Sequence, residues 1–288
     1  MTTRRVAGKL ALFVCLGTAL LAAPPLDQAR KLYNYTDFDG SLRLLLALPE
    51  KDGAALELIG RNYYMMGDYK KATQWLEQAV AADPSSAEHV LWLGRAYGRR
   101  AETSSPFTAP GFASRARQCF EKAAQLAPQN LEALNDLFEY YLEAPGILGG
   151  GYDKAARLAE RIGQIDSTEG YWAQAKLAEK RKEYGPAEQH LRRAAEAAPQ
   201  QVGRLIDLAK FLARHGRIQE ADQSLQLAQK VAPNSPQLMY ERAQMYIQQN
   251  RNLDTARDLL KRYLASTLTP DDPPRSAAQK LLKQISGS

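Results

Sequence analysis

Apolar residues recur along most of the chain at intervals of three and four positions, the spacing of one face of an α-helix. The segments from Leu56 to Tyr63 and from Val90 to Tyr97 both show this pattern. Strict alternation of apolar and polar residues never lasts more than a few positions, and β-branched runs are nearly absent. The pattern therefore predicts an all-α protein.

Many of the predicted helices share one motif. It consists of an alanine, a Phe or Leu four residues later, a second alanine after three more, and a proline five residues beyond that. The complete copies are Ala72–Leu76–Ala79–Pro84, Ala116–Phe120–Ala123–Pro128, Ala187–Leu191–Ala194–Pro199 and Ala221–Leu225–Ala228–Pro233. Looser copies begin at Ala155 and Ala256, and the successive first alanines are 44, 39, 32, 34 and 35 residues apart. A second helical segment precedes each copy, so the predicted unit is a helix pair.

A repeating helix pair of this length and with these residues resembles the tetratricopeptide repeat (TPR). The resemblance covers residues 53–268 as about six repeats. It implies helix-turn-helix units that stack into a right-handed superhelix with a concave groove. Residues 24–52 are predicted to form a degenerate leading helix pair, and residues 269–288 a capping helix over the last apolar face.

Two repeats contain extra residues, near 99–115 and 144–151. Both inserts fall between the two helices of their own repeat, so repeat geometry predicts that they lie side by side on one edge of the solenoid. Together they resemble segments of exported bacterial TPR proteins of unassigned function. We expect both inserts to be packed, with Phe107 and Phe112 in the first and with Ile147 and Leu148 under the neighbouring loop in the second.

The second insert ends in three consecutive glycines, Gly149, Gly150 and Gly151. Glycines at 146 and 151 have the spacing of a phosphate-binding loop, but Tyr152 and Asp153 stand where that loop needs Lys and then Ser or Thr. A wide turn with glycines at positive φ is therefore favoured. A backbone nest that binds an anion is the alternative.

The first 23 residues are typical of a secretory signal peptide, with a basic start, an uncharged stretch of 14 residues and a proline break. That stretch is shorter than the about 20 apolar residues of a membrane-spanning helix. The cleavage site is ambiguous, since Leu20 occupies the −3 position for one cut and Pro24 follows the other. We therefore expect an exported, periplasmic or envelope-associated protein, and an uncleaved N-terminal membrane anchor is the alternative.

The remaining composition argues against several classes of function. Of the 38 basic residues, three lie in the leader, and the other 35 are spread among 32 acidic ones, which predicts no nucleic-acid partner. Outside the leader Cys119 has no cysteine partner, and we expect it to be buried and inert. The histidines, His89, His190 and His215, fall at unrelated positions and are predicted on helix surfaces. The sequence thus predicts no cofactor, no metal site and no catalytic centre.

The concave groove is the first candidate site. The family resemblance places particular positions of each first helix on the concave face, and the candidates there are Arg61, Tyr64, Arg95, Asn135, Trp172, Lys176, Lys210 and Tyr240. Four of these occupy one equivalent position and form a partial basic ladder, suited to acidic groups or a peptide backbone and interrupted by Glu139 and Gln244. The alternative is that pairs such as Glu57 with Arg61 are only surface ion pairs one helical turn apart.

These features predict a non-catalytic scaffold or adaptor in the cell envelope that binds a protein or peptide in its groove. One alternative is a small-ligand or glycan binder, or an enzyme, at a ledge made by the two inserts. The ledge residues are Phe107, Phe112, Ile147, Leu148, Gly149, Gly150 and Gly151. A closed, polar-lined pocket at the inserts would favour the ledge. A self-assembly module is the third hypothesis.

Overall fold

The computed structural model describes residues 25–286, and within them every regular element is helical. The first part of the chain contains α1 (Pro25–Asn34), α2 (Phe38–Leu46), α3 (Gly53–Met65), α4 (Tyr69–Ala82), α5 (Ala87–Thr103), α6 (Ala109–Leu126), α7 (Leu131–Glu143) and a short 3-10 helix, η1 (Gly146–Leu148). The rest contains α8 (Tyr152–Ile165), α9 (Ser167–Lys180), α10 (Tyr184–Ala197), α11 (Val202–Arg214), α12 (Ile218–Val231), α13 (Pro236–Gln248), α14 (Leu253–Ala265) and α15 (Arg275–Ser286). The predicted all-α class is confirmed, whereas the predicted leader, residues 1–23, lies outside the described residues.

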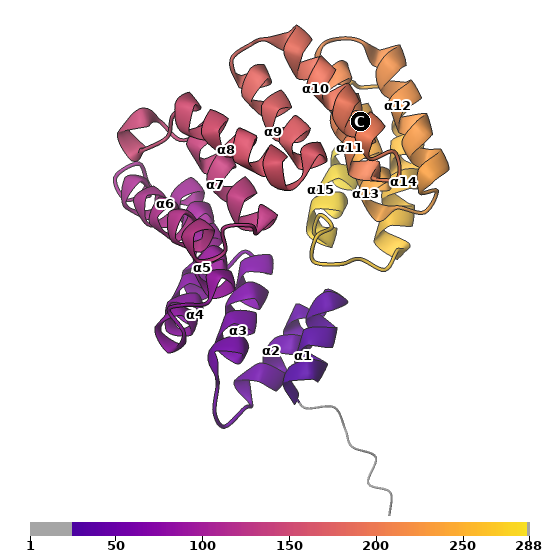
Figure 1. Ribbon diagram of the computed structural model, residues 1–288. Helices are drawn as coiled ribbons and strands as arrows, with labels where there is room; N and C mark the ends of the chain where they lie inside the picture. The colour runs from indigo at the N-terminus through magenta and orange to yellow at the C-terminus, as the bar shows by residue number, and fades with distance from the viewer. Residues whose placement is uncertain (1–24, 287–288) are drawn as a thin grey trace, which may run out of the picture.

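Consecutive helices pack as antiparallel pairs that stack into a curved solenoid (Figure 1). The first helices of the repeats, α3, α5, α7, α9, α11 and α13, form the inner row, and contacts such as α3 with α5 and α11 with α13 link them. Side chains that accept a backbone N–H start several of these helices, for example Asp52 before α3, Ser86 before α5 and Asn130 before α7. These caps place each inner helix at a defined point after the preceding turn.

Small residues set the distance between paired helices. The first alanine of each motif copy, Ala72 among them, is fully buried. A Cβ added at Gly60 would come within 2.5 Å of Leu76 Cγ, and one at Gly94 within 2.8 Å of Phe120 Cε1. Glycine at these two positions therefore lets the partner helix approach closely. Between the third and fourth repeats two glycines meet, since a Cβ at Gly170 on α9 would lie 2.3 Å from Gly163 Cα on α8.

The two inserts adopt different structures. The first lengthens its helices, so that α5 and α6 have 17 and 18 residues while the paired helices of the other repeats have 13 or 14. Phe107 lies in the turn between them and is 96% exposed, so its predicted packing is wrong. Phe112 does pack, because its ring stacks on Tyr97 and lies under the Arg100 guanidinium.

The second insert forms the predicted wide turn around η1. Gly149 and Gly151 have φ values of 88° and 156°, and the Lys154 ammonium donates to the Gly149 carbonyl. Leu148 is half-buried, but Ile147 is 93% exposed, so the predicted packing of Ile147 is wrong. The turn rests on α6 of the preceding repeat, where Gly149 meets the Arg117 side chain. The two inserts are thus neighbours, as repeat geometry predicts.

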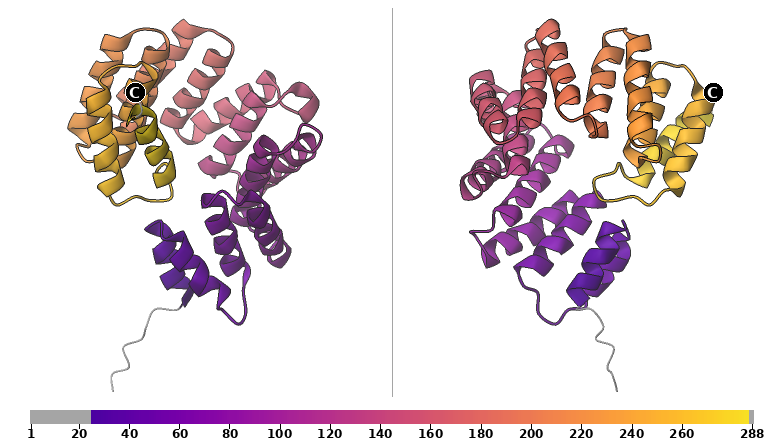
Figure 2. Two further views of the ribbon diagram at one scale, coloured as in Figure 1. Left: turned by 180° about the vertical axis from the view of Figure 1, so that it is seen from behind. Right: turned by 45° about the vertical axis from the view of Figure 1, so that its right-hand side comes forward.

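The solenoid curves until its two ends meet (Figure 2). The leading pair, α1 and α2, packs on α3 through Tyr33, Leu45 and Ile59, and α15 covers α14 through Ala278 and Ile285. A cavity of about 260 Å³ lies between the ends, and Thr36, Phe38, Met65 and Met66 line it together with residues of the segment 268–276. The concave face is therefore the inner side of a nearly closed ring. None of the described helices has the length and apolar character needed to cross a membrane.

Candidate functional site

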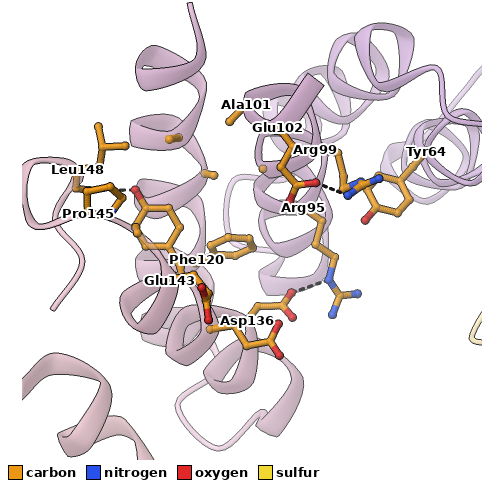
Figure 3. A pocket seen from close by; sticks show the side chains of 16 residues that line it. Tyr64, Arg95, Arg99, Ala101, Glu102, Phe120, Asp136, Glu143, Pro145 and Leu148 are labelled. Atoms are coloured by element: carbon orange, nitrogen blue, oxygen red, sulfur yellow. Dashed lines mark hydrogen bonds and ion pairs between the residues drawn. The ribbon is translucent and has the colours of Figure 1, made fainter. Parts of the chain in front are cut away.

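The concave groove and the second insert meet at a cavity of about 460 Å³ (Figure 3). Tyr64 of α3 lies at one side of it, and Pro145 and Leu148 of the insert lie at the other, with Phe120 between them. The complete lining is Tyr64, Arg95, Gly98, Arg99, Ala101, Glu102, Ala113, Ala116, Phe120, Asp136, Glu139, Tyr140, Glu143, Ala144, Pro145 and Leu148. The two candidate regions predicted from the sequence therefore share one opening.

The cavity exists because small residues face two aromatic rings. The Phe120 and Tyr140 rings lie 6.2 Å apart, and the Tyr140 hydroxyl donates to the Leu148 carbonyl oxygen at 2.9 Å, which fixes the insert against α7. Gly98 lies on the α5 wall, where an added Cβ would meet no atom within 4 Å. The floor is therefore largely apolar, and open space remains next to Gly98.

A line of four carboxylates runs along α7 beside this cavity. Glu132, Asp136, Glu139 and Glu143 are spaced by four, three and four residues, so they share one face of the helix. The helix contains no lysine or arginine. Three of the four line the cavity. Sequence reasoning treated Glu139 only as an interruption of a basic ladder, although an acidic face on a helix without bases was visible in the sequence.

Arginine and lysine side chains from neighbouring helices neutralise most of this line. Arg95 on α5 contacts Asp136 Oδ2 at 2.5 Å and Glu132 Oε1 at 2.7 Å, and Lys180 on α9 pairs with Glu143. Burial raises the pKa of the Asp136 carboxyl, and the Arg95 hydrogen bond offsets only part of this effect. Among the described residues, Glu139 has no ion-pair partner.

Glu139 is exposed at the cavity, yet the surrounding protein desolvates its carboxylate. This desolvation raises the pKa of Glu139, and the ammonium of Lys176 lowers it by a smaller amount. A desolvated carboxylate that lacks a hydrogen-bonded cation is stabilised when a cation approaches. The cavity thus holds one carboxylate whose charge is not balanced by a direct contact.

The predicted basic ladder exists, but most of its charges are engaged. Arg61 lies 3.2 Å from Glu57 and 2.9 Å from Glu88 of the next repeat. Lys210 lies 2.9 Å from Glu241, again in the next repeat. Arg61 therefore makes both the expected pair within its own helix and a contact between repeats. Lys176 has no ion pair among residues 25–286, and its ammonium lies 5.8 Å from the centre of the Trp172 ring.

The other predicted groove residues differ in accessibility. Tyr64 lines the cavity and meets Trp92 edge-on at 5.5 Å. Asn135 donates to Glu169 at 3.2 Å, and Trp172 is half-buried against Phe138. Tyr240 is only 8% exposed and packs on another tyrosine in the C-terminal core. The prediction that Tyr240 is available in the groove is therefore wrong.

A second cavity, of about 470 Å³, lies further along the groove. It is bounded by charged and amide side chains on α11 and α13, including Lys210, Arg214, Glu241, Gln244 and Gln248. Gln244, which sequence reasoning regarded only as an interruption, is therefore part of a polar site. Amide groups of this kind both donate and accept, which suits them to a peptide backbone.

Most residues of the predicted insert ledge lie outside the cavity next to it. Of its seven predicted residues only Leu148 lines the 460 Å³ cavity, while Phe107 and Ile147 project into solvent. A Cβ at Gly150 would come within 1.8 Å of the Ala144 carbonyl oxygen, so this glycine serves a tight backbone contact. The cavity beside the ledge is open and mainly apolar, which differs from the closed, polar pocket expected of a ledge binder.

Elsewhere in the described part of the chain, the titratable residues form no recognisable reactive cluster. His89 is buried, and its Nε2 lies 3.2 Å from Glu57 Oε2, so its predicted surface position is wrong. Burial raises the pKa of the Cys119 thiol to about 12, which keeps it protonated near neutral pH. Within residues 25–286 no group of three or more His, Cys, Asp or Glu residues is placed to hold a metal ion.

Comparison with known proteins identifies the repeat. Sequence profiles of the tetratricopeptide repeat match residues 53–86 and 206–273. The chain is similar in structure to a tetratricopeptide repeat protein of Parabacteroides merdae, with a TM-score of 0.57, 14% identity, and coverage of 91% of this chain and 97% of that one. It is also similar to a thermophilic TPR protein of Thermus thermophilus, with a TM-score of 0.54, 21% identity, and coverage of 65% and 97%. No curated protein matched the chain.

Proposed function

Because the chain is a tetratricopeptide-repeat protein, we propose that it is a non-catalytic scaffold that binds an extended segment of a protein partner along its concave groove. The observation that carries this proposal is the 460 Å³ cavity on the inner wall of the ring. Its volume lies within the range of roughly 300–1,000 Å³ that is typical of specific ligand sites. A side chain of the partner would enter it from the groove.

The order of surfaces along the groove supports an extended partner. The apolar cavity near α5–α7 is followed by Trp172 with Lys176, and then by the amide-lined cavity on α11 and α13. An extended peptide can fill such a row with alternate side chains while its backbone meets amide and charged groups. The approach of the two ends of the solenoid also favours a thin segment over a folded domain.

We propose further that this scaffold works in the cell envelope. The support is the basic, apolar and proline-containing arrangement of residues 1–23. Fractionation of the source cells and intact-mass measurement of the purified protein would test this. A mass starting near Pro24 in an envelope fraction is expected for a cleaved leader, and a mass starting at Met1 in a membrane fraction for an anchor. Recovery of the chain with Met1 from the cytosol would contradict the proposal.

The groove itself is best tested by filling the cavity without breaking an ion pair. Leu in place of Gly98 projects into open space on the α5 wall and occupies the cavity. Gly111→Leu is the matched control, because Gly111 is also helical with no atom within 4 Å of an added Cβ, but it lies near the start of α6 and lines neither groove cavity. Reversal of Arg95 or Lys210 is a weaker test, since it would also break contacts with Asp136 or Glu241.

In a cross-linking capture from cell envelopes, the chain from Pro24 onward is the bait. We expect Gly98→Leu to lose proteins that both the wild type and Gly111→Leu retain. Capture that is equal for all three baits would mean that the partner does not use this groove.

The insert-ledge alternative makes a different prediction at the same cavity. Pro145 and Leu148 form part of its rim, so a small ligand or glycan held there would depend on the insert. Substitution of Leu148 by Ser would then abolish binding of such a ligand, measured by isothermal titration against a panel of free sugars. For a groove-bound peptide, the same change is expected to weaken binding only modestly, because one of many contacts is removed.

A further inference from the structure

Glu139 is the cavity carboxylate without an ion pair, and its charge indicates which type of side chain of a bound peptide would enter the cavity. We propose that the cavity beside α7 receives a lysine or arginine side chain of the bound segment and that Glu139 forms the ion pair with it. This inference rests on the proposed peptide-binding function and specifies the chemistry of its partner. It reverses the expectation from the sequence, in which basic groove residues select acidic groups.

The balance of charges around the cavity supports a cationic occupant. Arg95 is shared by two carboxylates, and the cations of Arg99 and Lys180 are each matched by one carboxylate, Glu102 and Glu143. The Lys176 ammonium also acts on Glu139, but without an ion pair. Even with Lys176 included, the five carboxylates Glu102, Glu132, Asp136, Glu139 and Glu143 exceed the four cations by one negative charge. A lysine or arginine would reduce that excess, whereas an acidic side chain would increase it.

The shape of the cavity also fits a long basic side chain. Lys and Arg bury an aliphatic stem on apolar surface while their charged end contacts polar groups. Here the Phe120 ring and the alanines at 101, 113 and 116 form the apolar part, and Glu139 lies on the α7 side. The Tyr140 ring also lines the cavity, and its face can attract a cation. The volume leaves room for an apolar residue of the partner next to the basic one.

Glu139 can be tested without disturbing the fold, because it is exposed and has no ion pair among the described residues. Glu139→Gln keeps the size of the side chain and removes its charge. Glu160→Gln is the matched control, since Glu160 is exposed on α8 and is not part of either groove cavity. Both variants change the net charge of the protein by the same amount.

The probes are fluorescein-labelled peptides of sequence Gly-Ser-Ala-Leu-Xaa-Leu-Ala-Ser-Gly, in which Xaa is Arg, Lys, Gln or Glu. Binding to the chain from Pro24 onward is measured by fluorescence anisotropy at low salt. For the wild type and for Glu160→Gln we expect the Arg and Lys peptides to bind about tenfold more tightly than the Gln peptide, as one charge-assisted contact provides. The Glu peptide should be the weakest.

Three results together would support the inference. Glu139→Gln removes the preference for a cation and leaves the affinity for the Gln peptide unchanged. Glu139→Lys reverses the charge preference, so that the Glu peptide binds more tightly than the Arg peptide. Salt at about 1 M, where the screening length is only about 3 Å, reduces the preference of the wild type.

The failures of the two proposals differ. One outcome is that the peptides bind the wild type, bind Gly98→Leu more weakly, and show no preference among the four residues at Xaa. This outcome would overturn the cation site and leave the proposed groove intact. A preference for cations that survives in Glu139→Gln would also overturn it. Peptides that fail to bind the wild type, or that bind Gly98→Leu equally well, would contradict the groove and the cation site together.

Discussion

Two glycines one turn apart in α5 should respond in opposite ways to the same substitution. Gly94 lies against the second helix of its repeat, where an added Cβ would be 2.8 Å from Phe120 Cε1 and 3.0 Å from Cys119 Cβ. Gly98 lies on the open cavity wall, with no atom within 4 Å of an added Cβ. Replacing glycine by alanine within a helix stabilises it by roughly 1 kcal/mol in both cases.

The packing cost applies only at Gly94. Overpacking of a close contact costs about 1–3 kcal/mol, because the Phe120 ring and the Cys119 backbone must shift together. We therefore expect Gly98→Ala to raise the free energy of unfolding by roughly 1 kcal/mol. Gly94→Ala should leave it unchanged or lower it by up to about 2 kcal/mol. Since the propensity gain is common to both variants, the difference between them measures the packing term directly.

Urea unfolding followed by far-UV circular dichroism would measure both free energies. Hydrogen exchange of the α5 amides provides a second, local measurement, because repeat arrays can unfold in parts. Wild type and Gly111→Ala serve as references, the latter for an open helical glycine that does not line the cavity. Equal stabilisation by Gly94→Ala and Gly98→Ala would refute the argument that glycine is required at 94 for the close approach of α6.

The remaining predictions concern burial, pH and ring closure. Tyr240→Phe should leave stability nearly unchanged, whereas Tyr240→Ala should lower the free energy of unfolding by about 3–5 kcal/mol in urea titrations, because the ring is buried; a loss below about 1 kcal/mol would indicate an exposed groove residue instead. Cys119 is partly buried, and this burial raises the pKa of its thiol to about 12 in the folded state, from its usual value of 9.0. The contribution of the protonated thiol to folding stability is therefore present below pH 9 and is lost as pH rises towards 12. Native Cys119 should react slowly with iodoacetamide at pH 8 and rapidly once urea is added; equally rapid labelling of the native protein would contradict the raised pKa. Met66→Asp places a second carboxylate near Asp272 between the two ends of the solenoid, where the like charges repel. We expect a larger radius of gyration by small-angle scattering than for Met66→Ala. Identical scattering profiles would mean that the distance between the two ends does not depend on this contact.

The repeat and its helices were predictable because the information is local and periodic. Each helix pair needs an apolar face every three or four residues and a small residue where its partner crosses, and both requirements appear in the sequence at Gly60, Gly94 and the repeat alanines. The motif copies therefore predicted the all-α solenoid correctly. The wide turn at the second insert was predictable for the same reason, since glycines at 149 and 151 permit the backbone that the turn adopts.

Side-chain environments at helix ends and in inserts were less predictable. Repeat spacing located the first insert. Most of the insert is helical, because α5 and α6 extend into it, and Phe107 in the remaining turn is exposed to solvent. His89 is buried with its Nε2 beside the Glu57 carboxylate of the preceding repeat, a residue 32 positions away in the chain. Small differences in helix rotation decided these outcomes, and the amphipathic pattern does not specify them.

The sequence by itself determined which residues form helices, which helices pair and where the array is interrupted, since these follow from contacts within about 40 residues. Only the tertiary structure decided how the charges of the groove are distributed. Arg95 contacts Asp136, which lies 41 residues further along the chain. This contact pairs a cation of the predicted basic ladder with a carboxylate of α7, and Glu139 on the same helix has no such pair among the described residues. It also decided that the two ends of the solenoid approach each other, because the small rotation between successive repeats accumulates over the whole array into a curve that no single repeat encodes.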